Sequence, residues 1–344
     1  MLFLGHQSVY FSQKDISISN LNSEMDLNMK NWTSSSHVFY TALISCIIFI
    51  IAYAFLAEIG VIFLFETGEA IGTVSGWCER VSGGIFREPA NTLSNISFMI
   101  SGLVMLRVLS SEKSSVNSFF GINKISCLYA LVVIYLGPGS WLMHGTHTAW
   151  GGWADNQSMI MYIIFPWLYN LKEMGTWSEQ RFLSTYFVIV ILYSFGRWFL
   201  GGRLGIGLDL FGLSIALWVI SETLYKFWSP KFRWMSGFVG FAVAAIFGIF
   251  PNEILANPHE YWWVILFWIP SIFSKNAPSS SRVYTPWFFA GMLIFFAAFI
   301  VWLQGYPDQY LCRPDSWIQP HAIWHLMTAL STWCFFRFFR TQVR

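Results

Sequence analysis

The feature that most constrains this chain is its succession of long apolar segments. Ten can be drawn, over residues 39–65, 91–109, 124–144, 154–172, 182–200, 206–226, 234–250, 259–274, 285–304 and 320–338. A helix needs about 20 apolar residues to span a bilayer, and the segments at 234–250 and 259–274 are the shortest. Only 11% of the residues are charged, against about 25% in soluble proteins. Because a segment in lipid must satisfy its own backbone polar groups, the sequence predicts an all-α, multi-pass transmembrane helix bundle.

The distribution of charge predicts how the bundle is oriented. Residues 1–38 are polar and lack the apolar core of a signal peptide, so a disordered or loosely packed tail is expected before one transmembrane domain at 39–344. If the loops alternate sides, all but five of the 20 Lys and Arg fall on one side. The exceptions are Arg80, Arg87, Arg197, Arg203 and Arg313. The positive-inside rule then places both termini in the cytoplasm.

The loops on the non-cytoplasmic side are then residues 66–90, 145–153, 201–205, 251–258 and 305–319. Net charge is only +2, and no basic cluster with interleaved aromatic residues is present, so nucleic acid is not expected as a partner. No protein partner is predicted either.

Four of the seven histidines lie at helix ends that face these loops. They occur in the stretches Ser140-Trp-Leu-Met-His144-Gly-Thr-His147 and His321-Ala-Ile-Trp-His325. Residues four apart share one face of a helix, so His321 and His325 can bind one metal ion together. Ser140 and His144 share a face in the same way, and Asp155 follows at the start of the next helix.

This clustering points to a catalytic metal. Ionisable groups inside a membrane cost about 2.5–3.5 kcal/mol each. A single histidine at this depth more often hydrogen-bonds the backbone or a lipid headgroup, but two i, i+4 patterns beside an aspartate favour a metal. Three neutral imidazoles and one open position form a catalytic zinc site. Asp155 would then accept a proton from water, and Ser140 would donate to an oxyanion or orient a ligand.

The other histidines are given smaller roles. His147 is expected to support a metal ligand or to belong to the loop. No function is assigned to His6, His37 or His259.

Four short stretches resemble the alkaline ceramidase family, part of a superfamily of intramembrane hydrolases that includes the adiponectin receptors. The stretches are Glu88-Pro-Ala-Asn91-Thr92-Leu-Ser94-Asn95, Gly137-Pro-Gly139-Ser140-Trp-Leu-Met-His144, Asp155-Asn-Gln-Ser-Met159 and His321-Ala-Ile-Trp-His325. They match the family patterns Glu-x-x-Asn-Thr-x-Ser-Asn, Gly-x-Gly-Ser-x-x-x-His, Asp-x-x-x-Met and His-x-x-x-His. In this resemblance Asn91, Ser94 and Asn95 belong to the structural framework of the site.

The resemblance implies a zinc-dependent hydrolase that cleaves the amide bond of ceramide or a related N-acyl lipid. It implies His144, His321 and His325 as zinc ligands, Asp155 as the base and Ser140 as the group that stabilises the transition state. The family fold has seven helices, within a motif-bearing core at about 76–338. This chain is expected to add a helix at 39–65 and two more between Asp155 and His321.

The resemblance also implies a calcium site before the first core helix. The family's Asp-Trp-Cys-Glu segment is Gly76-Trp77-Cys78-Glu79 here, and Val81 replaces a further polar ligand. Glu79, Glu88 and the carbonyl of Trp77 remain as ligands, but the missing aspartate puts calcium in doubt.

Two further pairings are predicted. Cys78 and Cys312 both fall in non-cytoplasmic loops, where they are expected to form a disulfide. Asp209 is expected to pair with Arg197 or Arg203 at the same membrane level.

Three other functions stay open at this point. The same zinc chemistry would permit an esterase or phospholipase acting on glycerolipids. A receptor-like membrane protein could keep a zinc ion for stability alone. A transporter is disfavoured, because no inverted repeat or pair of broken helices is visible.

Overall fold

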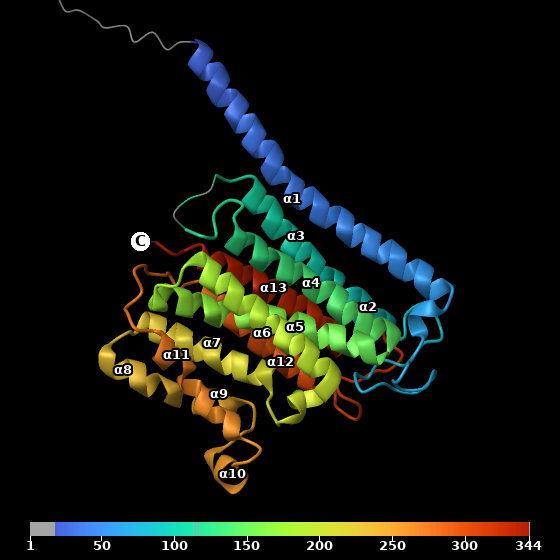
Figure 1. The fold of residues 1–344 in the computed structure, drawn as a ribbon. Helices are drawn as coiled ribbons and strands as arrows, with labels where there is room; N and C mark the ends of the chain where they lie inside the picture. Colours follow the sequence, from blue (N-terminus) through green and yellow to red (C-terminus); the bar gives the residue numbers. More distant parts are fainter. Residues whose placement is uncertain (1–17, 114, 116, 344) are drawn as a thin grey trace, which may run out of the picture.

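The chain is a bundle of helices, as predicted from its apolar segments. A computed structural model describes residues 18–113, 115 and 117–343. Within this part of the chain the only β pairings are isolated bridges. The long helices run side by side (Figure 1). They are α1 (Ile18–Glu58), α3 (Ile96–Ser110), α4 (Lys124–Thr146), α5 (Ala149–Gly175), α6 (Glu179–Leu200), α7 (Leu210–Lys226), α12 (Trp287–Leu303) and α13 (Pro320–Phe339), with the short α2 (Pro89–Ser94) ahead of α3.

Four stretches are long and apolar enough to cross a membrane, which supports a membrane protein. They are Ser36–Glu58, Pro89–Ser110, Lys124–Thr146 and Glu179–Leu200. Helix α12 is apolar but shorter. The total of ten spans and the cytoplasmic placement of both termini stay predictions.

The two shortest predicted segments are not continuous long helices. The region is divided into α8 (Pro230–Met235), η3 (Ser236–Phe238), α9 (Val239–Ile246), α10 (Pro251–Ala256), η4 (Trp262–Trp268) and α11 (Ile269–Phe273). Gly248 has a positive φ of 83° after α9, and proline begins or nearly begins both α10 and α11. These residues end helices because proline lacks an N–H donor and glycine accepts left-handed geometry. Helices α9 and α11 pack against α7, on one side of the bundle (Figure 1).

Helix α1 extends the first predicted apolar segment toward the N-terminus. It begins at Ile18, so residues 18–38 continue the first apolar segment as helix. No glycine or proline occurs between 18 and 58 to interrupt it. The helix packs against α3, and its N-terminal part extends away from the bundle (Figure 1). Residues 1–17, with His6, lie outside the described part of the chain.

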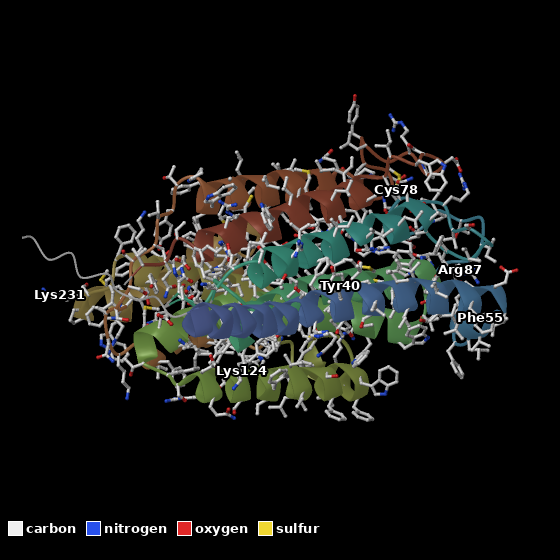
Figure 2. All side chains as sticks on the ribbon, turned by 90° about the horizontal axis from the view of Figure 1, so that it is seen from above. Tyr40, Phe55, Cys78, Arg87, Lys124 and Lys231 are labelled. Carbon is white, nitrogen blue, oxygen red and sulfur yellow. A yellow bond between two sulfur atoms is a disulfide. The ribbon has the colours of Figure 1, made fainter. Side chains whose placement is uncertain are left out.

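One end of the bundle is closed by the loop at 59–88, which is joined covalently to the connection between α12 and α13. Cys78 and Cys312 form a disulfide, the predicted pair. Arg80 adds an ion pair with Asp315 at 2.6 Å. Figure 2 shows Cys78 and Arg87 at this end, and Lys124 and Lys231 toward the other.

The opposite end holds a buried cluster that the sequence did not predict. The Arg282 side chain is fully buried and pairs with Glu222 at 2.9 Å. Its Nη1 also donates to Asn170 Oδ1, and its Nε donates to Gln342 Oε1. The Tyr284 hydroxyl donates to Glu222 at 2.8 Å. We name these five residues the arginine cluster; they join α5, α7, the segment before α12 and the chain end after α13.

The predicted pairing of Asp209 is wrong. Among the described residues no ion pair links Asp209 to Arg197 or Arg203. The Asp209 carboxylate instead accepts from the Gly212 backbone N–H at 3.0 Å and caps the start of α7. This is a local use that aspartate commonly has at a helix N-terminus.

Candidate active site

Helix ends bring the candidate residues together at the closed end of the bundle. His144 lies in the last turn of α4, which ends where His147 adopts a left-handed backbone. Thr148 then caps α5 by accepting from the Gly151 N–H at 3.1 Å, so Asp155 falls in the second turn of α5. Helix α13 begins at Pro320, a residue suited to the first helical position. His321 and His325 are therefore in its first two turns.

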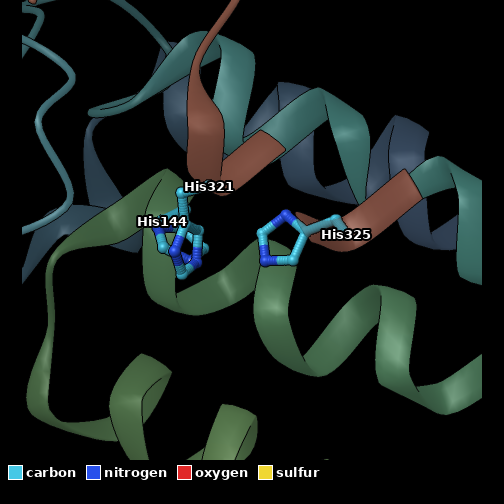
Figure 3. Close-up of side chains that lie close together, drawn as sticks. All are labelled: His144, His321 and His325. Carbon is cyan, nitrogen blue, oxygen red and sulfur yellow. The ribbon is translucent and has the colours of Figure 1, made fainter. Parts of the chain in front are cut away.

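The three predicted zinc ligands meet in space. Their ligand nitrogens all lie within 4.8 Å of one another, and His144 Nε2 is 3.0 Å from His321 Nε2. Two nitrogens bound to a tetrahedral zinc at about 2.0–2.1 Å would be roughly 3.3 Å apart. Figure 3 shows the three rings gathered between the two helices that carry them.

The outer nitrogens of two rings have partners that fix the tautomer. His144 Nδ1 donates to the Glu88 carboxylate. Ser94 Oγ donates its own proton to the Asn91 carbonyl, so it accepts from His325 Nδ1 at 2.7 Å. Both Nε2 atoms are left with a lone pair directed toward the centre of the triad. Metal-binding histidines are usually oriented in this way, and the donor set therefore fits a divalent ion such as zinc.

His321 is held differently. Its ring centroid lies 4.5 Å from that of Trp77, and its Nδ1 is buried without a hydrogen-bond partner among the described residues. Trp77 therefore packs against a candidate ligand through its ring.

Ser140 and Asp155 border the triad. Ser140 Oγ is 3.4 Å from His325 Nε2, and Asp155 is buried, with 8% of its surface exposed. Helices α4 and α5 pack closely beside them. A Cβ added at Gly139 would lie only 2.5 Å from the Ser158 Cβ. Ser140, Asp155 and the three histidines all line one cavity.

That cavity is suited to a hydrocarbon chain. Its volume is about 440 Å³. Away from the triad its walls are mainly aromatic and aliphatic, and include Phe98, Leu136, Phe211, Trp218, Phe247 and Phe335. Phe247 comes from the turn after α9, so the segment between α7 and α12 contributes to the wall. Apolar walls with a few polar groups at one end are typical of a site for an amphipathic ligand.

The carboxylates named for calcium already accept hydrogen bonds from the protein. Glu79 accepts from the backbone N–H groups of Ala90 and Asn91, at 2.7 and 2.8 Å, and so holds the first turn of α2. Burial raises the pKa of Glu79, although these two hydrogen bonds act to lower it. Burial alone would also raise the pKa of Glu88, but His144 and His147 outweigh it and leave that pKa well below its usual value.

The remaining histidines divide as follows. His147 Nε2 donates to Glu88 Oε1 at 3.0 Å, so this ring contacts the carboxylate that orients His144. His37 and His259 are both exposed and lie outside the triad. Sequence reasoning missed the shared contact at Glu88, since neither the spacing nor the residue types reveal which groups one carboxylate joins.

These observations define a helical membrane protein with three convergent histidines, a serine and an acid at one end of an apolar cavity. The family model described as Ceramidase matches residues 73–343. The chain therefore belongs to the ceramidase family and is a hydrolase acting on the amide bond of ceramide, which confirms the resemblance found in its motifs. No match was found among curated proteins.

Proposed function

We propose that this chain cleaves ceramide, or a related N-acyl lipid, with a zinc ion held by His144, His321 and His325. The observation that carries the proposal is the meeting of these imidazoles from α4 and α13, with lone pairs directed inward. Zinc bound there would polarise the amide carbonyl and make water nucleophilic near neutral pH.

Asp155 would transfer the proton, and Ser140 would stabilise the negative charge that develops on the carbonyl oxygen. Asp155 takes the proton of the attacking water and then delivers it to the amide nitrogen as the carbon–nitrogen bond breaks. The products are a fatty acid and the free amine. Ser140 donates a hydrogen bond to the oxygen that gains negative charge while the carbonyl carbon is tetrahedral. Burial of both side chains excludes bulk water, which strengthens these interactions.

The cavity supplies the position of the lipid. The acyl chain would lie along the apolar walls that extend from the triad past Phe211 and Phe247. The polar head would lie at the closed end of the bundle, near Trp77. The disulfide Cys78–Cys312 at this end supports a non-cytoplasmic location, since disulfides persist in oxidising compartments.

Asp155→Asn tests the mechanism. We expect turnover of ceramide, followed by mass spectrometry of the released base, to fall by about 10²- to 10⁴-fold, because a general acid–base group is lost. Zinc content of the purified variant should stay stoichiometric. Asp209→Asn makes the same chemical change at a helix cap and should leave turnover unchanged.

An Asp155→Asn variant with wild-type turnover would contradict the assigned base. A glycerolipid ester of the same fatty acid, assayed in parallel, shows whether hydrolysis is confined to the amide bond.

A further inference from the structure

The side chains that would bind the calcium implied by the family resemblance are either absent from this chain or already hydrogen-bonded. Gly76 has no side chain, and Val81 is apolar and only 2% exposed. Both carboxylate oxygens of Glu79 accept from backbone N–H groups that start α2. Calcium prefers six to eight oxygen ligands, several of them from carboxylates. The residues present therefore do not fit calcium.

The Glu88 carboxylate already accepts three hydrogen bonds. It is completely buried. Its Oε2 accepts from His144 Nδ1 and from Asn91 Nδ2 at 3.0 Å, while its Oε1 accepts from His147 Nε2 at 3.0 Å. A cation at Glu88 would compete with these three donors for the carboxylate oxygens.

His147 is held firmly in this position by the first loop. Its carbonyl accepts from the backbone N–H groups of Thr67 and Gly68 at 2.9 and 3.0 Å. Its Nδ1 lies 3.6 Å from Glu69 Oε2, so the ring lies between two carboxylates, those of Glu69 and Glu88. Gly68 is required for this packing, since a Cβ there would lie 2.5 Å from His147 Nδ1.

We propose that His147 takes the place of the implied calcium in this chain. Its ring joins the first loop to Glu88, and Glu88 in turn fixes the ring of His144. His147 is thus a positioning residue for the zinc site, and the folded protein needs no calcium. The inference rests on the proposed function, because it assumes that His144 binds zinc.

Calcium binding can be tested without an activity assay. The thermal unfolding midpoint of the purified, zinc-loaded protein is measured in detergent with and without millimolar calcium chloride, with magnesium chloride as the control. A ligand that binds only the folded state raises this midpoint. We expect the same midpoint in all three conditions. A rise with calcium that magnesium does not reproduce would overturn the proposal.

Two substitutions at His147 test the positioning role. His147→Leu removes the donor to Glu88, and His147→Gln retains an N–H donor of similar reach. Both introduce a side chain at the same left-handed backbone position, φ 51°, so they carry a similar backbone cost. Loss of a group that supports a metal ligand usually weakens metal binding by about 10- to 100-fold. We expect that loss in His147→Leu and near wild-type zinc affinity in His147→Gln.

Substitution of cobalt for zinc gives a spectroscopic readout of the same site. The visible absorption of the His147→Leu cobalt form should differ from wild type, and that of His147→Gln should not. Equal zinc affinity in His147→Leu and wild type, or equal loss in both variants, would overturn the inference. If wild type itself binds no zinc, the proposed function is wrong. The calcium measurement would still decide whether the folded chain binds calcium.

Discussion

Two buried polar clusters lie at opposite ends of the bundle, and they differ in what they leave unpaired. In the arginine cluster the charges of Arg282 and Glu222 meet directly, and uncharged side chains take up most of the remaining hydrogen bonds. At the histidine end, ring nitrogens of three histidines lie within 4.8 Å of one another, and His321 Nδ1 has no hydrogen-bond partner among the described residues. The first cluster pairs its buried charge within the protein, whereas the second gathers ring nitrogens that could bind a cation.

The physical reason for this difference is the cost of burying a polar group. An unpaired polar group in a dry interior costs about 1–3 kcal/mol, so pairing is the rule. Arg282 is further covered by the Tyr225 ring, 3.9 Å from the guanidinium carbon. The arginine cluster is therefore a link between helices. The histidine triad instead gathers ring nitrogens around one point, where the proposed metal ion would be their common partner.

Of these variants, His321→Ala should have the largest effect, on zinc content and on ceramide turnover. It removes one of the three proposed zinc ligands, so zinc content should fall far below one per chain and ceramide turnover should reach background. Metal analysis and mass spectrometry of the product measure both. His259→Ala, on an exposed loop, is the matched control and should change neither. Full zinc content in His321→Ala would remove the triad from the mechanism.

Glu222→Leu should have the next largest effect, on stability and not on metal binding. It leaves the Arg282 charge buried without its partner, which costs about 3–5 kcal/mol. Chemical unfolding in detergent micelles measures the loss. The double variant Glu222→Leu/Arg282→Met removes both charges and should recover most of it. Zinc per folded molecule should stay at the wild-type level, and a parallel loss of zinc would show that the two ends are coupled.

Ser94→Ala should have the smallest effect of the three. It removes the acceptor of His325 Nδ1, so zinc affinity should fall by about 10- to 100-fold while the fold is retained. Competition with a zinc chelator measures this change. Ser101→Ala, which loses only contacts to Ala329 and Thr332 further along α13, should bind zinc as wild type does. Identical affinities in both variants would mean that Ser94 does not orient the ligand.

Much of the site could be predicted because its signals are local. The i, i+4 spacing of His321 and His325 and the shared face of Ser140 and His144 follow from helix geometry alone. The bounds of α4, α12 and α13 lie within a few residues of the apolar segments. The expected Asp209 ion pair failed because a nearby backbone N–H competed successfully for the carboxylate.

The sequence by itself determined the helical class, the membrane character and the family, since hydrophobic length and helix periodicity depend on neighbouring residues. Only the tertiary structure decided that Glu88 joins His144 to His147, and that Arg282 reaches Glu222 across 60 positions of the chain. Such contacts depend on how helices pack and on which donors compete for one buried acceptor. No local pattern encodes that competition.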